Sequence, residues 1–235
     1  VPAIMAARNL EYERDRIITL LVVPFIPCSA RTVIIMALAG KYLGAGYITL
    51  IYLGNIAVAL AMSFLLSRFN VETSPGIIMD VPPLRRPYAG IVLRKVWAMT
   101  YEFLAFAWPV IAISSIVLAV MAHAGVDAYV NAALSPVTAF VLDLPENLGI
   151  TLFLGIFRKE LTLIMLESAL GTANIATVLS PAQLLVLVVF TVLYIPCIAT
   201  ISTLWKEGGW KVAAASVALN TAVALAVAGT IAHVL

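Results

Sequence analysis

Two short motifs that contain the only cysteines of the chain are the clearest candidates for chemistry. Phe25-Ile-Pro-Cys-Ser-Ala-Arg-Thr32 and Tyr194-Ile-Pro-Cys-Ile-Ala-Thr-Ile201 share the isoleucine, the proline, the cysteine and the alanine, and an aromatic residue opens each. A proline in a membrane helix frees a carbonyl one turn earlier, and a thiol beside it is a soft metal ligand. The repeat therefore predicts an ion site that Cys28 and Cys197 share; the alternative is that each proline is a kink and each cysteine a packing residue.

Charged residues inside an apolar stretch form the second group of candidates. Glu160 follows Arg158 and Lys159 at the centre of such a stretch, and Glu167 lies seven residues further on, on the same face of a helix. Ionisable residues within a membrane span are costly and usually mark a pathway or an internal ion pair. We expect Glu160 to contribute to the pathway; the alternatives are a structural ion pair with its basic neighbours and, for Glu167, a position in water near a helix end.

Three further residues are weaker candidates for the same pathway. Ser29 belongs to the first Pro-Cys motif, and Met165 lies close to the two glutamates in sequence. Arg31 follows in that motif, but the preferred interpretation of this residue is structural: a cation that satisfies the carbonyls freed by Pro24 and Pro27.

Composition indicates which elements must position these residues. The 235 residues are 63% hydrophobic and only 11% charged, whereas a soluble domain carries about 25% charge. This excludes a soluble core, a nucleic-acid binder, a disordered chain and a disulfide-stapled secreted module. No G-x-x-x-x-G-K-[ST] loop, Ser/His/Asp set or H-E-x-x-H motif is present, so nothing favours an enzyme. The sequence predicts an all-α polytopic protein in contact with the lipid bilayer.

Gaps between charged residues define the expected spans. Four stretches have the roughly 20 residues that cross a bilayer, namely 42–67, 103–126, 181–204 and 212–235. The stretches 17–40 and 148–170 are also long enough, but each is interrupted in its middle, the first by two prolines and the second by three charged residues. We therefore expect a single transmembrane domain over 1–235, with about six helices, two of them interrupted at mid-membrane, and an aqueous and interfacial loop over 68–101.

The distribution of lysine and arginine predicts the orientation. With the first residues in the cytoplasm, eight loop cations lie inside and three, Lys41, Lys206 and Lys211, lie outside. The N-terminus, the loop 68–101 and the C-terminus are then expected in the cytoplasm, with the protein in the cell inner or plasma membrane. The charged residues 8–16 exclude a signal peptide, and the chain is expected to begin inside a longer protein.

The motifs resemble the membrane part of the ferrous-iron transport protein B (FeoB) family, in family order over essentially the whole chain. The motifs that carry the resemblance are Val23-Pro-Phe-Ile-Pro-Cys-Ser-Ala-Arg31, Val81-Pro-Pro-Leu-Arg-Arg-Pro87, Leu144-Pro-Glu-Asn147, Gly155-Ile-Phe-Arg-Lys-Glu160 and Tyr194-Ile-Pro-Cys-Ile-Ala-Thr200. The resemblance implies a permease that takes Fe²⁺, as substrate, into the cytoplasm, with no cofactor bound within the chain. It implies gate-type regions at about 17–67 and 148–204, with Cys28 and Cys197 as the gate cysteines and Glu160 in the second gate region.

The resemblance also implies partners. FeoB proteins carry an N-terminal GTP-binding domain that this sequence lacks, so a GTPase domain or a small Feo-type accessory protein is an expected partner, and a homo-oligomer is possible through Gly/Ala-rich helix faces. Two other functions stay open. One is a nucleoside-recognition transporter, which needs aromatic and amide groups around a roomy pocket; the other is a non-transporting subunit of a membrane assembly.

Overall fold

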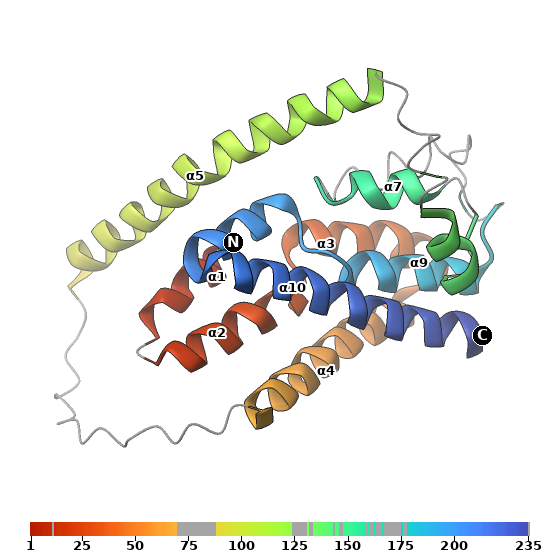
Figure 1. Cartoon of the computed structure of the whole chain (residues 1–235), viewed down its shortest axis with the longest axis horizontal. Coiled ribbons are helices and arrows are strands. Elements are labelled where there is room, and N and C mark those ends of the chain that lie inside the picture. The colour runs from red at the N-terminus through yellow and green to blue at the C-terminus, as the bar shows by residue number, and fades with distance from the viewer. Residues whose placement is uncertain are drawn as a thin grey trace.

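Helices make up the regular structure in the residues that the computed structural model describes (Figure 1). These residues are 1–10, 12–69, 88–123, 131, 134–142, 144–145, 148–157, 159, 162, 166, 175 and 178–234. The elements are α1 (Pro2–Ala6), η1 (Ala7–Asn9), α2 (Glu13–Val22), η2 (Val23–Phe25), α3 (Ser29–Ile34), η3 (Ile35–Leu43), α4 (Ala45–Phe69), α5 (Ala89–His123), η4 (Pro136–Val141), α7 (Gly149–Leu154), α9 (Pro181–Leu193) and α10 (Ile198–Val234). The predicted all-α membrane class is confirmed for this part of the chain.

Four segments of the described chain are long and apolar enough to cross a membrane. They are Glu13–Leu43, Ala45–Arg68, Ala89–Val117 and Pro181–Val234. The first contains the break between α2 and α3, and the last contains the break between α9 and α10. The predicted count of about six spans is not confirmed, because much of the stretch 148–170 lies outside the described residues.

α10 is a helical hairpin rather than one straight rod. Gly209 interrupts it with φ 80° and ψ 171°, a backbone conformation that is open to glycine and strained for other residues. The arm after this reversal packs back against α9, so that Val227 and Ile231 line one apolar cavity with Leu185 and Val189. The predicted stretch 212–235 is the second arm of this hairpin, whereas the stretch 181–204 comprises α9, the break and the beginning of the first arm (Figure 1).

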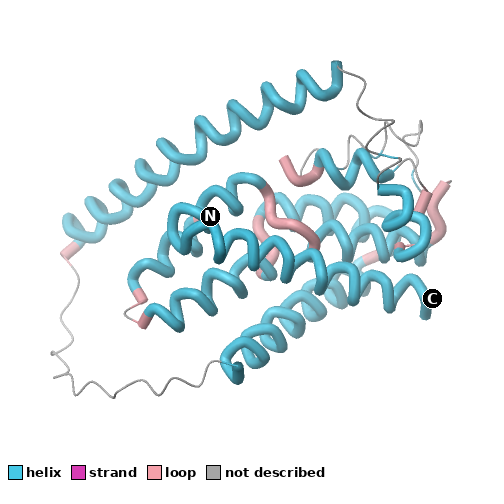
Figure 2. The backbone as a smooth tube through the Cα atoms, viewed as in Figure 1, coloured by secondary structure: helices cyan, strands magenta, loops and turns pink. Residues whose placement is uncertain are grey.

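The two interrupted helices lie side by side in the middle of the bundle, where their breaks are drawn as loop segments (Figure 2). Their apolar residues share one core, which includes Phe25, Ile34 and Leu38 from the first helix and Leu184 and Leu187 from the second, all with almost no exposed surface. Burial of whole leucine, isoleucine and phenylalanine side chains holds the two breaks at one depth of the bundle.

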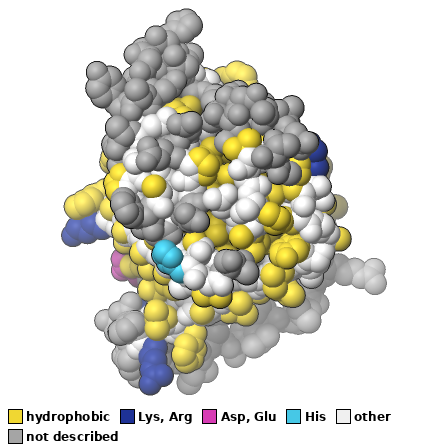
Figure 3. All heavy atoms as spheres, turned by 90° about the vertical axis from the view of Figure 1, so that its right-hand side faces the viewer, with side chains coloured by type: hydrophobic (Ala, Val, Ile, Leu, Met, Phe, Trp, Pro, Cys, Tyr) yellow, Lys and Arg dark blue, Asp and Glu magenta, His cyan; other side chains and the backbone are white. Residues whose placement is uncertain are grey.

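The two ends of the bundle differ in charge. The end that holds α1 and the start of α5 carries Arg8, Arg14, Arg16, Arg68, Arg94, Lys95, Lys206 and Lys211. The opposite end, where α4 begins and α10 finishes, carries Lys41. Hydrophobic and uncharged side chains dominate the described surface of that second end (Figure 3).

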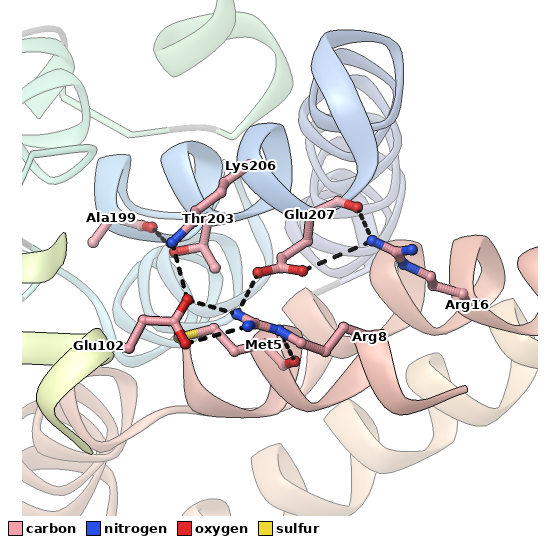
Figure 4. Close-up of polar contacts among 8 residues, drawn as sticks. All are labelled: Met5, Arg8, Arg16, Glu102, Ala199, Thr203, Lys206 and Glu207. Carbon is pink, nitrogen blue, oxygen red and sulfur yellow. Dashed lines mark hydrogen bonds and ion pairs between the residues drawn. The ribbon is translucent and has the colours of Figure 1, made fainter. Parts of the chain in front are cut away.

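Five charged side chains join four parts of the chain at the first end, and we call them the five-charge cluster (Figure 4). Arg8 donates to both carboxylate oxygens of Glu102 at 3.1 and 3.2 Å and to Glu207 at 2.7 Å. Arg16 approaches the same Glu207 carboxylate at 3.8 Å and donates to its backbone carbonyl. Lys206 donates to Glu102 at 3.2 Å. The cluster thus connects η1, α2, α5 and α10.

The cluster corrects the predicted placement of Lys206. Lys206 was expected outside and Arg8 inside, but both donate to the same Glu102 oxygen and therefore lie at one end of the bundle. Ser67 lies at this end as well, because its carbonyl accepts a hydrogen bond from Arg14. Val234, in the last turn of α10, lies at the other end of the bundle (Figure 1). On which side of the membrane each terminus lies stays a prediction.

Candidate functional site

The first break places Cys28 at the start of a helix. The hydrogen-bond ladder of α2 cannot continue through Pro24 and Pro27, because neither carries an N–H. The backbone is extended at Cys28, with φ −87° and ψ 173°, and α3 begins at the next residue. The Cys28 carbonyl accepts the Thr32 N–H at 2.9 Å and the Thr32 hydroxyl at 3.2 Å, and the Cys28 side chain is exposed.

Cys197 has the corresponding position in the second break. Pro196 lies between the end of α9 and the start of α10, and α10 begins directly after Cys197. The Cys197 carbonyl accepts the backbone N–H of Thr200 at 2.8 Å and of Ile201 at 3.0 Å, while its Sγ lies 3.2 Å from the Thr200 hydroxyl. The repeated sequence motif is thus a repeated backbone arrangement, in which a cysteine opens the second half of a broken helix.

One cavity of about 470 Å³ is lined by both cysteines. Its wall includes Pro24, Cys28 and Arg31 from the first broken helix, Pro196, Cys197 and Thr200 from the second, and Phe157 and Lys159 from the chain beyond α7. The structure therefore brings the two thiols to a shared space between the breaks. That an ion uses this space stays a prediction.

Arg31 connects the two breaks. Its side chain is buried, and one guanidinium nitrogen donates to the Pro24 carbonyl while another donates to the Tyr194 carbonyl at 3.5 Å. The contact with Pro24 is structural in kind, but the acceptor is the Pro24 carbonyl rather than the carbonyls one turn earlier that Pro24 and Pro27 free. The contact with Tyr194, in the second break, was not predicted, because no sequence pattern pairs these positions.

Lys159 is a second buried cation in the cavity wall. Its ammonium donates to the Thr191 carbonyl at 3.0 Å and lies 4.3 Å from the centre of the Tyr194 ring, a favourable cation–π distance. Tyr194 in turn donates its hydroxyl to the Leu152 carbonyl at 2.9 Å. In the sequence, Lys159 was considered only as a neighbour of Glu160, although a cation at the centre of an apolar stretch is itself a signal for a functional position.

Gly155 permits the close contact between the α7 region and the second break. A Cβ atom at this position would lie 2.5 Å from the Tyr194 hydroxyl and 2.8 Å from the Thr162 hydroxyl. The next residue continues the contact, because the Ile156 carbonyl accepts the Ile198 N–H at 3.0 Å. The segment that carries Lys159 is therefore held directly against the start of α10.

The remaining sequence candidates are placed as follows. Glu160, Met165 and Glu167 lie outside the described residues, so their roles stay predictions. Ser29 is the exposed first residue of α3 and is not among the residues that line the cavity. Within the described part of the chain, no three or more His, Cys, Asp or Glu side chains are grouped as a metal site. The described site thus offers two thiols and the carbonyls of the breaks.

A smaller cavity of about 160 Å³ lies beside this site, toward the five-charge cluster. Pro2 lines both cavities, and Met5, Met99 and Glu102 line the smaller one. Arg8 also lines it, and the hydrogen bond to Glu102 raises the pKa of this guanidinium, so that it stays charged at any physiological pH. The smaller cavity is therefore lined by a carboxylate that two cations already bind.

The chain is similar to two protein-family models and to several individual proteins. A family model described as "Nucleoside recognition" (Gate) matches residues 104–211, and one for the C terminus of ferrous iron transport protein B matches residues 48–98. The Fe(2+) transporter FeoB of Methanocaldococcus jannaschii is 32% identical over 97% of this chain and 38% of its own length. FeoB of Staphylococcus aureus (strain COL) is 28% identical, with 93% and 36% covered.

A Porphyromonas gingivalis protein named as a fusion of Fe(2+) transport protein A and Fe(2+) transporter FeoB is 38% identical over 50% of this chain and 14% of its own length. No solved structure is significantly similar to the chain. The chain spans less than two fifths of the length of the curated relatives that it matches nearly end to end. Both family models and this similarity over almost all of its residues show that the chain belongs to the ferrous iron transport protein B family and corresponds to part of its membrane region.

Proposed function

We propose that this chain is the permease part of a ferrous iron transporter and that Fe²⁺ enters the cytoplasm through the cavity between the two helix breaks. The observation that carries the proposal is the position of Cys28 and Cys197, each at the start of a half-helix and both in the wall of one cavity. Broken helices that meet in a bundle are typical transport sites.

The ligand chemistry supports a metal ion of intermediate softness. Thiols bind soft and borderline cations, and backbone carbonyls add weak, exchangeable ligands, so that the ion is held loosely enough to leave. These ligand types suit Zn²⁺ and Cu⁺ as well. The choice of Fe²⁺ among them comes from the printed function of the FeoB relatives. Iron is thus the transported substrate rather than a resident cofactor.

Transport of a nucleoside is the second candidate, because the family model that matches residues 104–211 is described as nucleoside recognition. A nucleoside site needs aromatic rings to stack on the base and amides to bind its edge. The described wall of the cavity contains one aromatic ring, Phe157, and no asparagine or glutamine. The composition of this wall therefore favours the ion.

An uptake experiment separates these candidates. The protein is reconstituted in vesicles and offered radiolabelled Fe²⁺, kept reduced with ascorbate, or radiolabelled uridine and adenosine. We expect saturable iron uptake above that of protein-free vesicles, with nucleosides at background. Nucleoside uptake without iron uptake would establish the second candidate, and uptake of neither would favour a non-transporting subunit.

The cytoplasmic side is proposed to be the end with the five-charge cluster. This follows from the positive-inside rule, because the described loop cations gather there and only Lys41 among them lies at the other end. With this orientation the segment 1–16 and the turn at Gly209 face the cytoplasm, and Val234 faces outward. The membrane is proposed to be the cell inner or plasma membrane.

Two partners complete the proposal. The sequence has no phosphate-binding loop, so any GTP hydrolysis that drives transport is assigned to a GTP-binding domain outside this chain, and no reaction is assigned to the chain itself. A small Feo-type accessory protein is the second partner, supported by the protein in which transport protein A is fused to FeoB.

A further inference from the structure

We propose that Arg31 and Lys159 hold the pathway closed by keeping their tethered donor groups on the carbonyl oxygens that a permeating cation would otherwise use. The inference rests on the proposed function and adds to it two residues that control when metal enters the site. It is carried by the hydrogen bonds, the burial and the charge of the described cavity wall.

The first observation concerns the carbonyls of the two breaks. The last carbonyls of a helix have no partner within that helix, and a broken membrane helix therefore exposes cation ligands in its middle. Three such oxygens, those of Pro24, Thr191 and Tyr194, are bound by Arg31 or Lys159. A metal ion that used any of these oxygens would have to displace one of the two side chains.

The second observation concerns charge. Arg31 and Lys159 are 3% and 2% exposed, and both line the cavity that contains the two thiols. No aspartate or glutamate is among the described residues of its wall. A divalent cation entering this space would meet the positive charge of Arg31, and that of Lys159 when its amine is protonated, in surroundings of low dielectric constant, where repulsion is stronger than in water. The observed arrangement therefore opposes the ion that the thiols and carbonyls would bind.

The third observation links the two cations to movable contacts. Lys159 lies four residues after Gly155, and this segment is held against the second break by the Tyr194 hydroxyl and the Ile156–Ile198 backbone hydrogen bond. A shift of this one segment away from α10 would remove the ammonium from the Thr191 carbonyl. Arg31 spans both breaks, so separation of the breaks releases its bond to Tyr194. The incoming metal ion then takes the place of these side-chain donors at the Thr191 and Tyr194 carbonyl oxygens.

A closing role and a purely structural role give opposite phenotypes. If the two cations only satisfy buried carbonyls, their removal lowers stability and uptake together. If they close the pathway, their removal raises the passive flux of metal in a protein that is still folded. Passive flux without nucleotide is therefore the readout, because a structural role does not increase it.

The test uses Arg31→Met and Lys159→Met, which keep an unbranched side chain and remove the charge. Lys211→Met is the matched control, since Lys211 is exposed and does not line the cavity. Vesicles with a metal-quenched dye inside receive a gradient of Fe²⁺ or Co²⁺ without nucleotide. We expect each cavity variant to leak at least about tenfold faster than the parent, as the loss of a charge-assisted contact implies, and the control to match the parent. Folded cavity variants as tight as the parent overturn the proposal.

Arg31→Lys keeps the test decisive if the methionine variants do not fold. A lysine ammonium retains the charge but reaches only one of the Pro24 and Tyr194 carbonyls, so we expect a leak rate between that of the parent and that of Arg31→Met. A leak rate equal to that of the parent overturns the proposal. Failure of the proposed function looks different. If the variants leak Co²⁺ but the parent takes up no iron, only the proposed iron transport is contradicted. If the parent takes up iron but the variants do not leak, only the closing role is contradicted.

Discussion

Arg8 and Glu207, which are 199 positions apart in the sequence, form an ion pair with 2.7 Å between the guanidinium nitrogen and the carboxylate oxygen. The same arginine also binds Glu102 of α5, so the segment before α2, the third membrane segment and the reversal of α10 meet at one end. These two contacts place the three segments at one end of the bundle.

The shared side can be tested by labelling. In a Cys28→Ser/Cys197→Ser background, single substitutions Ser67→Cys, Lys211→Cys and His233→Cys report three positions. We expect an impermeant maleimide to label positions 67 and 211 from the cytoplasmic side and position 233 from the outside, because Arg14 binds the Ser67 carbonyl and Lys211 follows the cluster residues Lys206 and Glu207 closely in α10. Labelling of positions 67 and 211 from opposite sides would contradict the arrangement.

Glu207 should contribute more to stability than Glu102. The Glu207 side chain is 7% exposed and approaches both Arg8 and Arg16, whereas that of Glu102 is 39% exposed. We expect Glu207→Gln to lower the free energy of unfolding by about 1–3 kcal/mol, because it leaves two cations short of a buried charged partner.

The measurement is thermal unfolding in one detergent, with Glu102→Gln as the control. Water and salt screen the exposed carboxylate, so its loss should have the smaller effect. High salt should reduce the difference in unfolding temperature between the parent and Glu102→Gln. It should reduce the corresponding difference between the parent and Glu207→Gln by less. An equal or larger loss of stability in Glu102→Gln would refute the ranking.

The reversal at Gly209 should depend on glycine. A residue with a Cβ atom is strained at φ 80°, so Gly209→Ala is expected to destabilise the protein by about 1–3 kcal/mol. Gly54→Ala is the control: position 54 lies inside α4 with no atom within 4 Å of a built Cβ, and alanine should stabilise a helix interior there. Thermal unfolding of both variants checks the difference; two similar effects would show that the reversal does not need glycine.

Local sequence signals predicted the start of α9 and the two breaks. The predicted stretch 181–204 begins where α9 begins, at Pro181, and the structure shows a capping box between Ser180 and Gln183. The Pro-Cys motifs predicted interruptions, and each cysteine does precede the second half of a broken helix. These features depend on missing N–H donors and nearby side chains, which a sequence displays directly.

The sequence could not predict contacts between distant segments. Lys206 was placed outside because each loop was assigned a side from the expected number of spans. A count of charges does not show that Lys206 and Arg8 bind the same Glu102 carboxylate. Lys159 was likewise considered beside its sequence neighbours, whereas its observed acceptor is the Thr191 carbonyl, 32 positions away. Tertiary packing, rather than local pattern, sets both.

Iron uptake by the Cys28→Ser/Cys197→Ser variant shows whether the two thiols carry the ion. Serine is nearly isosteric with cysteine but is a harder ligand, so the variant should fold like the parent, with the same elution volume and unfolding temperature. We expect its uptake of radiolabelled Fe²⁺ to fall to that of protein-free vesicles. Uptake equal to that of the parent in the folded double variant would exclude the thiols from the pathway and leave both as packing residues.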